Sequence, residues 1–101
     1  MASAIDPHAA LRDRVMKIVL DGGGETDSAL RHAAADGRGV PADLQSLIEK
    51  IHASAYKVTD DDIARLQSSY SDDKLFEIIV SAALGASRQR LEAGLKALDG
   101  A

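Results

Sequence analysis

Cysteine is absent from this chain of 101 residues, and so is tryptophan. Without a thiol, the chain can form no disulfide, bind no metal through sulfur and perform no thiolate catalysis. Aromatic residues make up only 3% of the sequence, and Phe76 is the one phenylalanine. The core is therefore expected to consist of Leu, Ile, Val and Ala, which supply most of the 46% apolar residues. A chain of this length predicts a single domain, residues 1–101.

Basic clusters and long apolar runs are also missing. The chain has 12 Lys and Arg residues against 16 Asp and Glu residues, for a net charge of −4. No basic patch is interleaved with aromatic residues, so we expect no nucleic-acid partner. No apolar run reaches the roughly 18 residues of a membrane span. The first residues lack the basic start and apolar run of a signal peptide, so the default expectation is a cytoplasmic protein.

Glycine and proline divide the sequence that remains into helical segments. Asp6 followed by Pro7 is typical of a helix start, and the run Gly22–Gly24 is expected to end this first helix. Four apolar residues of the segment share one helical face: Leu11, Val15, Ile18 and Val19.

Helix caps, glycines and a proline likewise predict a second and a third helix. Thr26 or Asp27 is expected to cap a short helix, and Gly37 and Gly39 are expected to end it. Pro41 then opens the third helix. Apolar residues follow at helical spacing, namely Leu44, Leu47, Ile48, Ile51 and Ala55.

Two acidic clusters follow hydroxyl residues. Asp60–Asp62 comes after Thr59, and two aspartates come after Ser71. Such clusters can bind a metal ion, but an EF-hand loop also requires a glycine and a distant glutamate, which are absent here. Ser and Thr are preferred helix caps, and acids in the first turn face the positive end of the helix dipole. We therefore interpret both clusters as helix starts, with Thr59 and Asp62 forming a capping box, and expect no metal site.

The C-terminal segment is predicted to be a long, buried helix. Residues 75–86 are apolar on nearly every side, which is typical of a helix covered by its neighbours. Gly85 within this helix suggests that another helix crosses closely there. The following residues are amphipathic, with one apolar stripe formed by Leu91, Leu95 and Leu98. The leucine stripe predicts a homo-oligomer. No segment shows the alternation of apolar and polar residues that is typical of a strand, so the predicted fold class is all-α with about five helices.

Three side chains are candidates for acid–base or metal chemistry. Glu49 and His52 share a helical face, but a di-iron bundle needs two such pairs and two more glutamates. His32 lies four residues after Ser28, which would allow contact on a helix, but a nucleophilic pair also needs an orienting acid and an oxyanion hole. The catalytic candidates are therefore His32, His52 and Glu49, and no cofactor is indicated.

The stretch "VTDDDIARLQSSYSDDKLFEIIVSAALGASRQRLEAGL", residues 58–95, resembles the C-terminal part of alkylhydroperoxidase D-like proteins, the carboxymuconolactone decarboxylase superfamily. The resemblance covers more than a third of the chain. It implies an all-helical bundle with a long buried C-terminal helix that assembles into oligomers.

Active members of this superfamily carry a glutamate, a Cys-x-x-Cys pair and a histidine. With His32 on the family histidine, Ser28 and Glu25 fall on the cysteines and Asp13 falls on the upstream acid. Because this chain has no cysteine, peroxide reduction by that route is excluded. The resemblance then implies a binding or scaffolding module. The alternative is a cysteine-independent acid–base enzyme of the decarboxylase type, acting on a small cyclic acid through His32 or His52.

Overall fold

The computed structural model describes residues 8–100, and over this range the chain consists of helices and turns without a strand. The elements in chain order are α1 (Ala9–Asp21), α2 (Ser28–Asp36), α3 (Ala42–Ser54), the 3-10 helix η2 (Ala55–Lys57), α4 (Asp60–Leu66) and α5 (Asp72–Gly100). The predicted all-α class with about five helices is confirmed for this part of the chain. Asp6 and Pro7, which predict the first helix start, lie outside the described residues.

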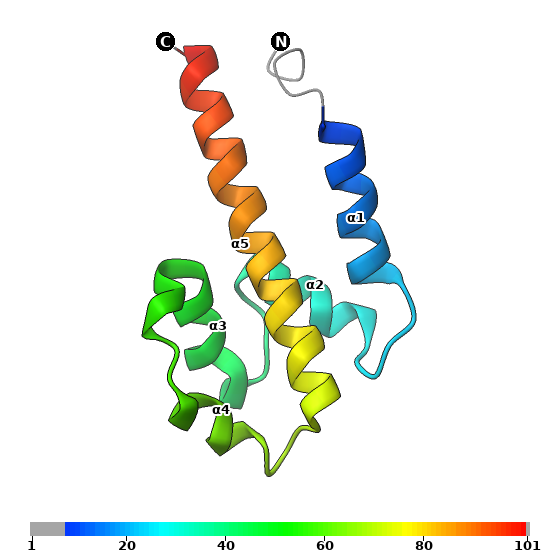
Figure 1. The fold of residues 1–101 in the computed structure, drawn as a ribbon, viewed down its shortest axis with the longest axis vertical. Coiled ribbons are helices and arrows are strands. Elements are labelled where there is room, and N and C mark those ends of the chain that lie inside the picture. Colours follow the sequence, from blue (N-terminus) through cyan, green and yellow to red (C-terminus); the bar gives the residue numbers. More distant parts are fainter. Residues whose placement is uncertain (1–7, 101) are drawn as a thin grey trace.

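The longest helix, α5, runs from one end of the molecule to the other (Figure 1). Its 29 residues extend about 43 Å at 1.5 Å per residue, close to the molecule's longest dimension of 47 Å. The inner face of its first half packs against α2 and α3. The main core gathers residues of α2 to α5 and of the connection between α2 and α3: Ala34, Val40, Leu44, Leu47, Ile48, Ile51, Leu66, Leu75, Ile78 and Ala82.

Gly85 marks the place where α2 crosses α5. A Cβ atom added to Gly85 would lie 2.0 Å from the carbonyl oxygen of Ala35, which is backbone and cannot swing away. The predicted close crossing at Gly85 is therefore confirmed. Any side chain here forces the two helices apart.

The predicted helix stops at glycine are confirmed as well. α1 ends at Asp21, and the amide of Gly22 donates to the carbonyl of Ile18. α2 ends at Asp36, and Gly37 adopts a φ of 83°, the left-handed conformation that glycine tolerates best. At the start of α2, Asp27 occupies the cap position but its side chain makes no capping hydrogen bond.

Three of the four residues on the predicted apolar face of the first helix are exposed. Leu11, Val15 and Ile18 are 56%, 42% and 64% exposed, whereas the buried residues of α1 are Met16 and Leu20. These two pack with Ala35 and Leu84 in a second, smaller cluster: Met16, Leu20, Ala35, Val19 and Leu84. Helical periodicity identifies an apolar stripe, but it cannot tell whether the same chain covers that stripe.

Two further apolar residues are more exposed than their spacing suggests. Phe76, within the segment expected to be covered on nearly every side, is 68% exposed on the outer face of α5. Ala55 lies in η2 and is exposed, because the regular α3 helix has already ended at Ser54. The buried part of α5 is therefore its inner face.

Candidate functional site

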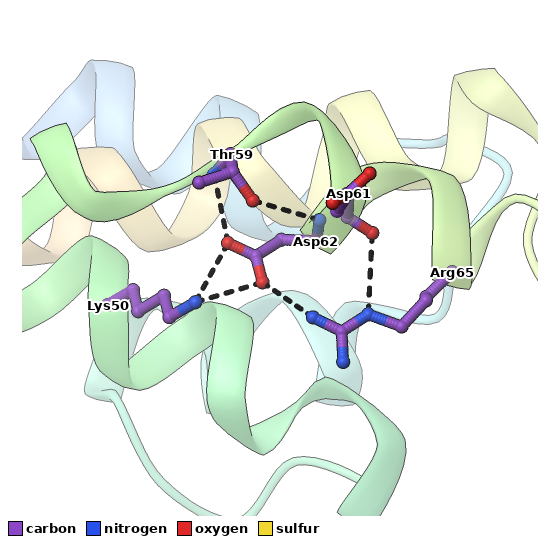
Figure 2. Close-up of polar contacts among 5 residues, drawn as sticks. All are labelled: Lys50, Thr59, Asp61, Asp62 and Arg65. Atoms are coloured by element: carbon purple, nitrogen blue, oxygen red, sulfur yellow. Dashed lines mark hydrogen bonds and ion pairs between the residues drawn. The ribbon is translucent and has the colours of Figure 1, made fainter.

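The acidic stretch after Thr59 places one buried carboxylate between two basic side chains (Figure 2). The side chain of Asp62 is only 5% exposed. Lys50 Nζ donates to both of its oxygens at 2.9 Å, and Arg65 Nη2 donates to Oδ1 at 3.0 Å. The backbone amide of Thr59 donates to Oδ2 at 2.9 Å. Each carboxylate oxygen thus accepts two hydrogen bonds.

Asp62 also completes the predicted capping box, which is confirmed. Its amide donates to Thr59 Oγ1 at 3.3 Å, while its carboxylate accepts from the Thr59 amide. The hydrogen bonds from Lys50 and from the Thr59 amide lower the pKa of Asp62 from 3.8 to about 2. The carboxylate is therefore ionised at neutral pH and fully engaged in structural contacts.

The neighbouring acids do not join Asp62 in a metal-binding arrangement. Asp60 and Asp61 are exposed on the first turn of α4. Within residues 8–100, no group of three or more His, Asp or Glu side chains is placed to hold a metal ion. The second cluster likewise starts a helix, since Ser71 Oγ accepts the amide of Lys74 at 3.2 Å in the first turn of α5.

His52 supports the end of another helix. Its Nε2 lies 2.8 Å from the carbonyl oxygen of Ala34, which only accepts, so Nε2 carries the hydrogen. The ring also rests against Gly37, where an added Cβ would come within 3.1 Å of three ring atoms. Glu49, predicted to share its face, is exposed on α3. The two candidate residues thus form no joint site in the structure.

The contact between Ser28 and His32 that helical spacing allows does not form. Ser28 Oγ donates instead to the carbonyl of Leu20 at 2.7 Å, and His32 Nε2 lies 2.5 Å from Asp21 Oδ1. The hydrogen bond with His32 lowers the pKa of Asp21. The sequence missed this pair because Asp21 belongs to the preceding helix, eleven residues away.

The reason for this arrangement is that α2 caps the end of α1. The last carbonyls of a helix have no partner within it and must find donors elsewhere. Arg31, 5% exposed, donates from Nη1 to the Val19 carbonyl at 2.8 Å and from Nη2 to the Gly22 carbonyl at 2.6 Å. Ser28 satisfies Leu20 in the same way. The hydroxyl that the sequence offered as a nucleophile is thus a helix cap.

The glycine-rich connection between α1 and α2 wraps around a carboxylate of α5. Glu77 accepts from the amides of Glu25 and Thr26 at 2.7 and 3.0 Å, and from Thr26 Oγ1 at 2.7 Å. These hydrogen bonds, with the Thr26 hydroxyl contributing most, lower the pKa of Glu77. A Cβ on Gly24 would approach Glu77 Oε1 to 2.7 Å, so glycine allows the close approach.

The positions that the family resemblance assigns to a redox centre have separate contacts. Glu25 binds Glu77 through its amide, and Ser28 binds the Leu20 carbonyl. Asp13, placed on the upstream acid, pairs with Arg88 at 3.3 Å. None of these contacts links two of the assigned positions. The described residues therefore show no catalytic constellation at this place.

An apolar hollow lies between α1 and the middle of α5. It has a volume of about 340 Å³. Its residues come from both helices: His8, Leu11, Arg12, Val15, Met16, Leu84, Ser87, Arg88 and Leu91. Leu11, Val15 and Leu91 remain 40% or more exposed. Apolar side chains line an open groove here, and the sequence signal for it was the pair of leucine-containing stripes on the first and last helices.

A second hollow, of about 300 Å³, lies beside the candidate residue His32. It is lined by Met16, Leu20, His32, Ala35, Asp36, Gly85, Arg88, Gln89 and Glu92. His32 and Asp21 form a contact at its edge, and both side chains are 48% exposed.

The described helices include none that is long and apolar enough to cross a bilayer. No protein-family model matches this chain, and no curated protein or solved structure matches it either.

Proposed function

We propose that this chain is a non-catalytic helical module that associates with a second copy of itself through the apolar surface of α1 and α5. One observation carries the proposal. Large apolar side chains gather, exposed, on these two helices: Leu11, Val15, Ile18, Phe76, Leu91 and Leu98. Leu11, Val15 and Leu91 of this set line one hollow together, and contiguous exposed apolar patches mark interaction sites in soluble proteins.

The contrast with the titratable residues supports a binding role. Asp62, His52 and Glu77 are each held by hydrogen bonds that stabilise helix ends or connections. A catalytic site needs polar groups that converge on free space. The groove between α1 and α5 instead offers mainly aliphatic side chains.

The predicted stripe on the last helix fits the same role. Leu91 is 40% exposed, Leu98 is 67% exposed and Leu95 is partly buried. Burying a leucine is worth about 1.5–3 kcal/mol. A second copy offers the same apolar surface, and a twofold arrangement is the commonest way for identical chains to bury it.

The alkylhydroperoxidase D-like resemblance remains part of the proposal. Supporting it are the Thr59 cap, the Ser71 turn and the long α5, which follow one another in the order that the resemblance implies. The absence of cysteine from the chain excludes the peroxidase activity of that superfamily.

A pair of exposed apolar residues provides the test. Leu91→Asp places a charge on the proposed surface, whereas Tyr56→Asp alters a residue that is 84% exposed on η2, outside it. Light scattering should give a two-chain mass for the wild type and for Tyr56→Asp, and a one-chain mass for Leu91→Asp. Equal masses for the two variants would reject the proposed surface.

The alternative, a cysteine-independent acid–base enzyme of the decarboxylase type, is favoured by one observation. The Asp21–His32 pair lies at the edge of a hollow that also contains Arg88, a residue able to bind a carboxylate. Turnover of a small cyclic acid by the wild type, lost in His32→Gln and retained in His52→Gln, would establish this function. No turnover of such acids would remove it.

A further inference from the structure

The outer face of α5 carries an uncharged stripe that spans most of the helix. Its seven positions are separated by four, three and four residues, and then by four, three and four again: Phe76, Val80, Ala83, Ser87, Leu91, Gly94 and Leu98. Six of these residues are exposed and Val80 is partly buried. The stripe contains Leu91 and Leu98 of the three leucines that the sequence suggested and extends well beyond them, whereas Leu95 is partly buried and lies outside it.

The spacing repeats every eleven residues, from Phe76 to Ser87 and from Ser87 to Leu98. Three turns of an α-helix take about 10.8 residues, so residues eleven apart lie almost directly above one another. The stripe therefore runs nearly parallel to the axis of α5. A second straight helix can follow it along its whole length of about 33 Å.

The inner positions of the stripe, between its two ends, have an order of large and small residues that is complementary to its own reverse. When the stripe is reversed about Ser87, Ala83 lies opposite Leu91, and Val80 lies opposite Gly94. Well-packed helix pairs place large residues against small ones in this way. Two stripes running in the same direction would instead set leucine against leucine and glycine against glycine.

From this pattern we infer that two copies of the chain pair their α5 helices antiparallel, with the two Ser87 residues facing each other at the twofold axis. The inference rests on the proposed self-association and specifies its orientation and register. The exposed Phe76 of one copy then lies beside Leu98 of the other copy. The second half of α5, which extends past the main core, is covered by the first half of the partner helix.

The contact between the two α5 helices alone is smaller than a stable dimer interface, so we expect α1 to contribute to the interface as well. A contact of about 33 Å by 10 Å covers roughly 330 Å² of projected face on each copy. Stable interfaces bury about 800 Å² per partner. Leu91 belongs both to the stripe and to the lining of the groove that α1 forms with α5. A helix on the stripe thus reaches the exposed Leu11 and Val15 of α1.

Engineered cysteines provide the test, because the chain has none of its own. Helices whose axes are 8–10 Å apart bring facing Cα atoms within about the 4.4–6.8 Å that a disulfide needs. Ser87→Cys should therefore form a disulfide-linked dimer under mild oxidation. Ser46→Cys, an exposed serine on α3, is the matched control. A complex holds paired thiols at roughly millimolar effective concentration, so Ser87→Cys should react roughly 100-fold faster at about 10 μM protein.

A second pair of variants reports whether the two α5 helices pair antiparallel or parallel. In an equimolar mixture of Ala83→Cys and Leu91→Cys, antiparallel pairing predicts mainly mixed disulfides between the two variants. Parallel pairing predicts disulfides within each variant, and this result would overturn the inference. Equal rates for Ser87→Cys and Ser46→Cys, together with a two-chain mass of the reduced proteins, would reject the register but retain the self-association. A one-chain mass of the wild type would reject both.

Discussion

The imidazole Nε2 of His52, on α3, donates a hydrogen bond of 2.8 Å to the carbonyl of Ala34, in the last turn of α2. The same relationship recurs along the chain. Arg31 of α2 binds carbonyls at the end of α1, and Arg90 of α5 donates to the carbonyl of His52, near the end of α3, at 2.6 Å. Later helices thus supply hydrogen-bond donors for the ends of earlier helices. Polar side chains that resemble catalytic candidates in the sequence therefore have a structural role.

Removing the imidazole of His52 should reduce stability. His52→Ala takes away the donor to Ala34 and the ring that packs on Gly37, and leaves the buried Ala34 carbonyl with the 3.2 Å hydrogen bond from the Gly37 amide. A loss of about 1–3 kcal/mol in the free energy of unfolding is expected. Urea denaturation followed by circular dichroism measures it. Glu49→Ala, at an exposed position of the same helix, should change stability by less than about 0.5 kcal/mol. Similar losses in both variants would contradict the capping role.

The stabilising effect of the α4 cap should not depend on the neighbouring exposed acidic residues. Thr59→Ala removes the hydroxyl that accepts the amide of Asp62 and should cost about 1 kcal/mol. Thr59→Ser retains a hydroxyl and should keep most of this stability. Asp61→Asn, at an exposed position, should have little effect. If calorimetry instead showed tight divalent-metal binding that Asp61→Asn abolishes, the cluster would be a metal site.

The capping box illustrates what sequence alone predicts well. Thr59 and Asp62 are three residues apart, so helix geometry brings them together whatever the rest of the fold does. Lys50, the strongest partner of Asp62, lies twelve residues earlier on another helix. Which lysine reaches Asp62 depends on how α3 packs on α4, and no local pattern encodes that.

The same distinction explains why Ser28 and His32 do not contact each other. Helical spacing permits their contact, but both side chains face the end of α1, where Leu20 offers a carbonyl and Asp21 a carboxylate. Local spacing carries no information about that neighbour. Likewise, the stripe of Leu11, Val15 and Ile18 was visible in the sequence, whereas its exposure follows from where α1 sits.

Acid should weaken the fold through Asp62. Its pKa is lowered to about 2 in the folded chain, mainly by Lys50, from an ordinary value of 3.8. A carboxyl with a lowered pKa contributes stability that is fully present above pH 4 and is lost as the pH falls toward 2. The free energy of unfolding of the wild type should therefore fall over this range. Asp62→Asn should be less stable at neutral pH and should lose less stability between pH 4 and 2. Equally steep curves for Asp62→Asn and the wild type would contradict this assignment.

Adding even one methyl group at Gly85, where α2 crosses α5, should destabilise the fold. Alanine favours a helix over glycine by about 1 kcal/mol, yet a Cβ here would lie 2.0 Å from the backbone oxygen of Ala35. Gly85→Ala should therefore lower the free energy of unfolding by about 1–3 kcal/mol, and Gly85→Leu by more. Gly23→Ala is the matched control, because a Cβ there meets nothing within 4 Å. An unchanged or higher melting temperature for Gly85→Ala would show that the crossing is looser than described.

Self-association through α5 is the central claim, and sedimentation equilibrium of the wild type tests it most directly. The mass of one chain is 10.6 kDa. At micromolar concentrations and physiological salt, the account predicts a mass of two chains that falls toward one chain on dilution. Leu91→Asp at the same concentrations should sediment as one chain. A wild-type mass of one chain throughout the micromolar range would contradict the account.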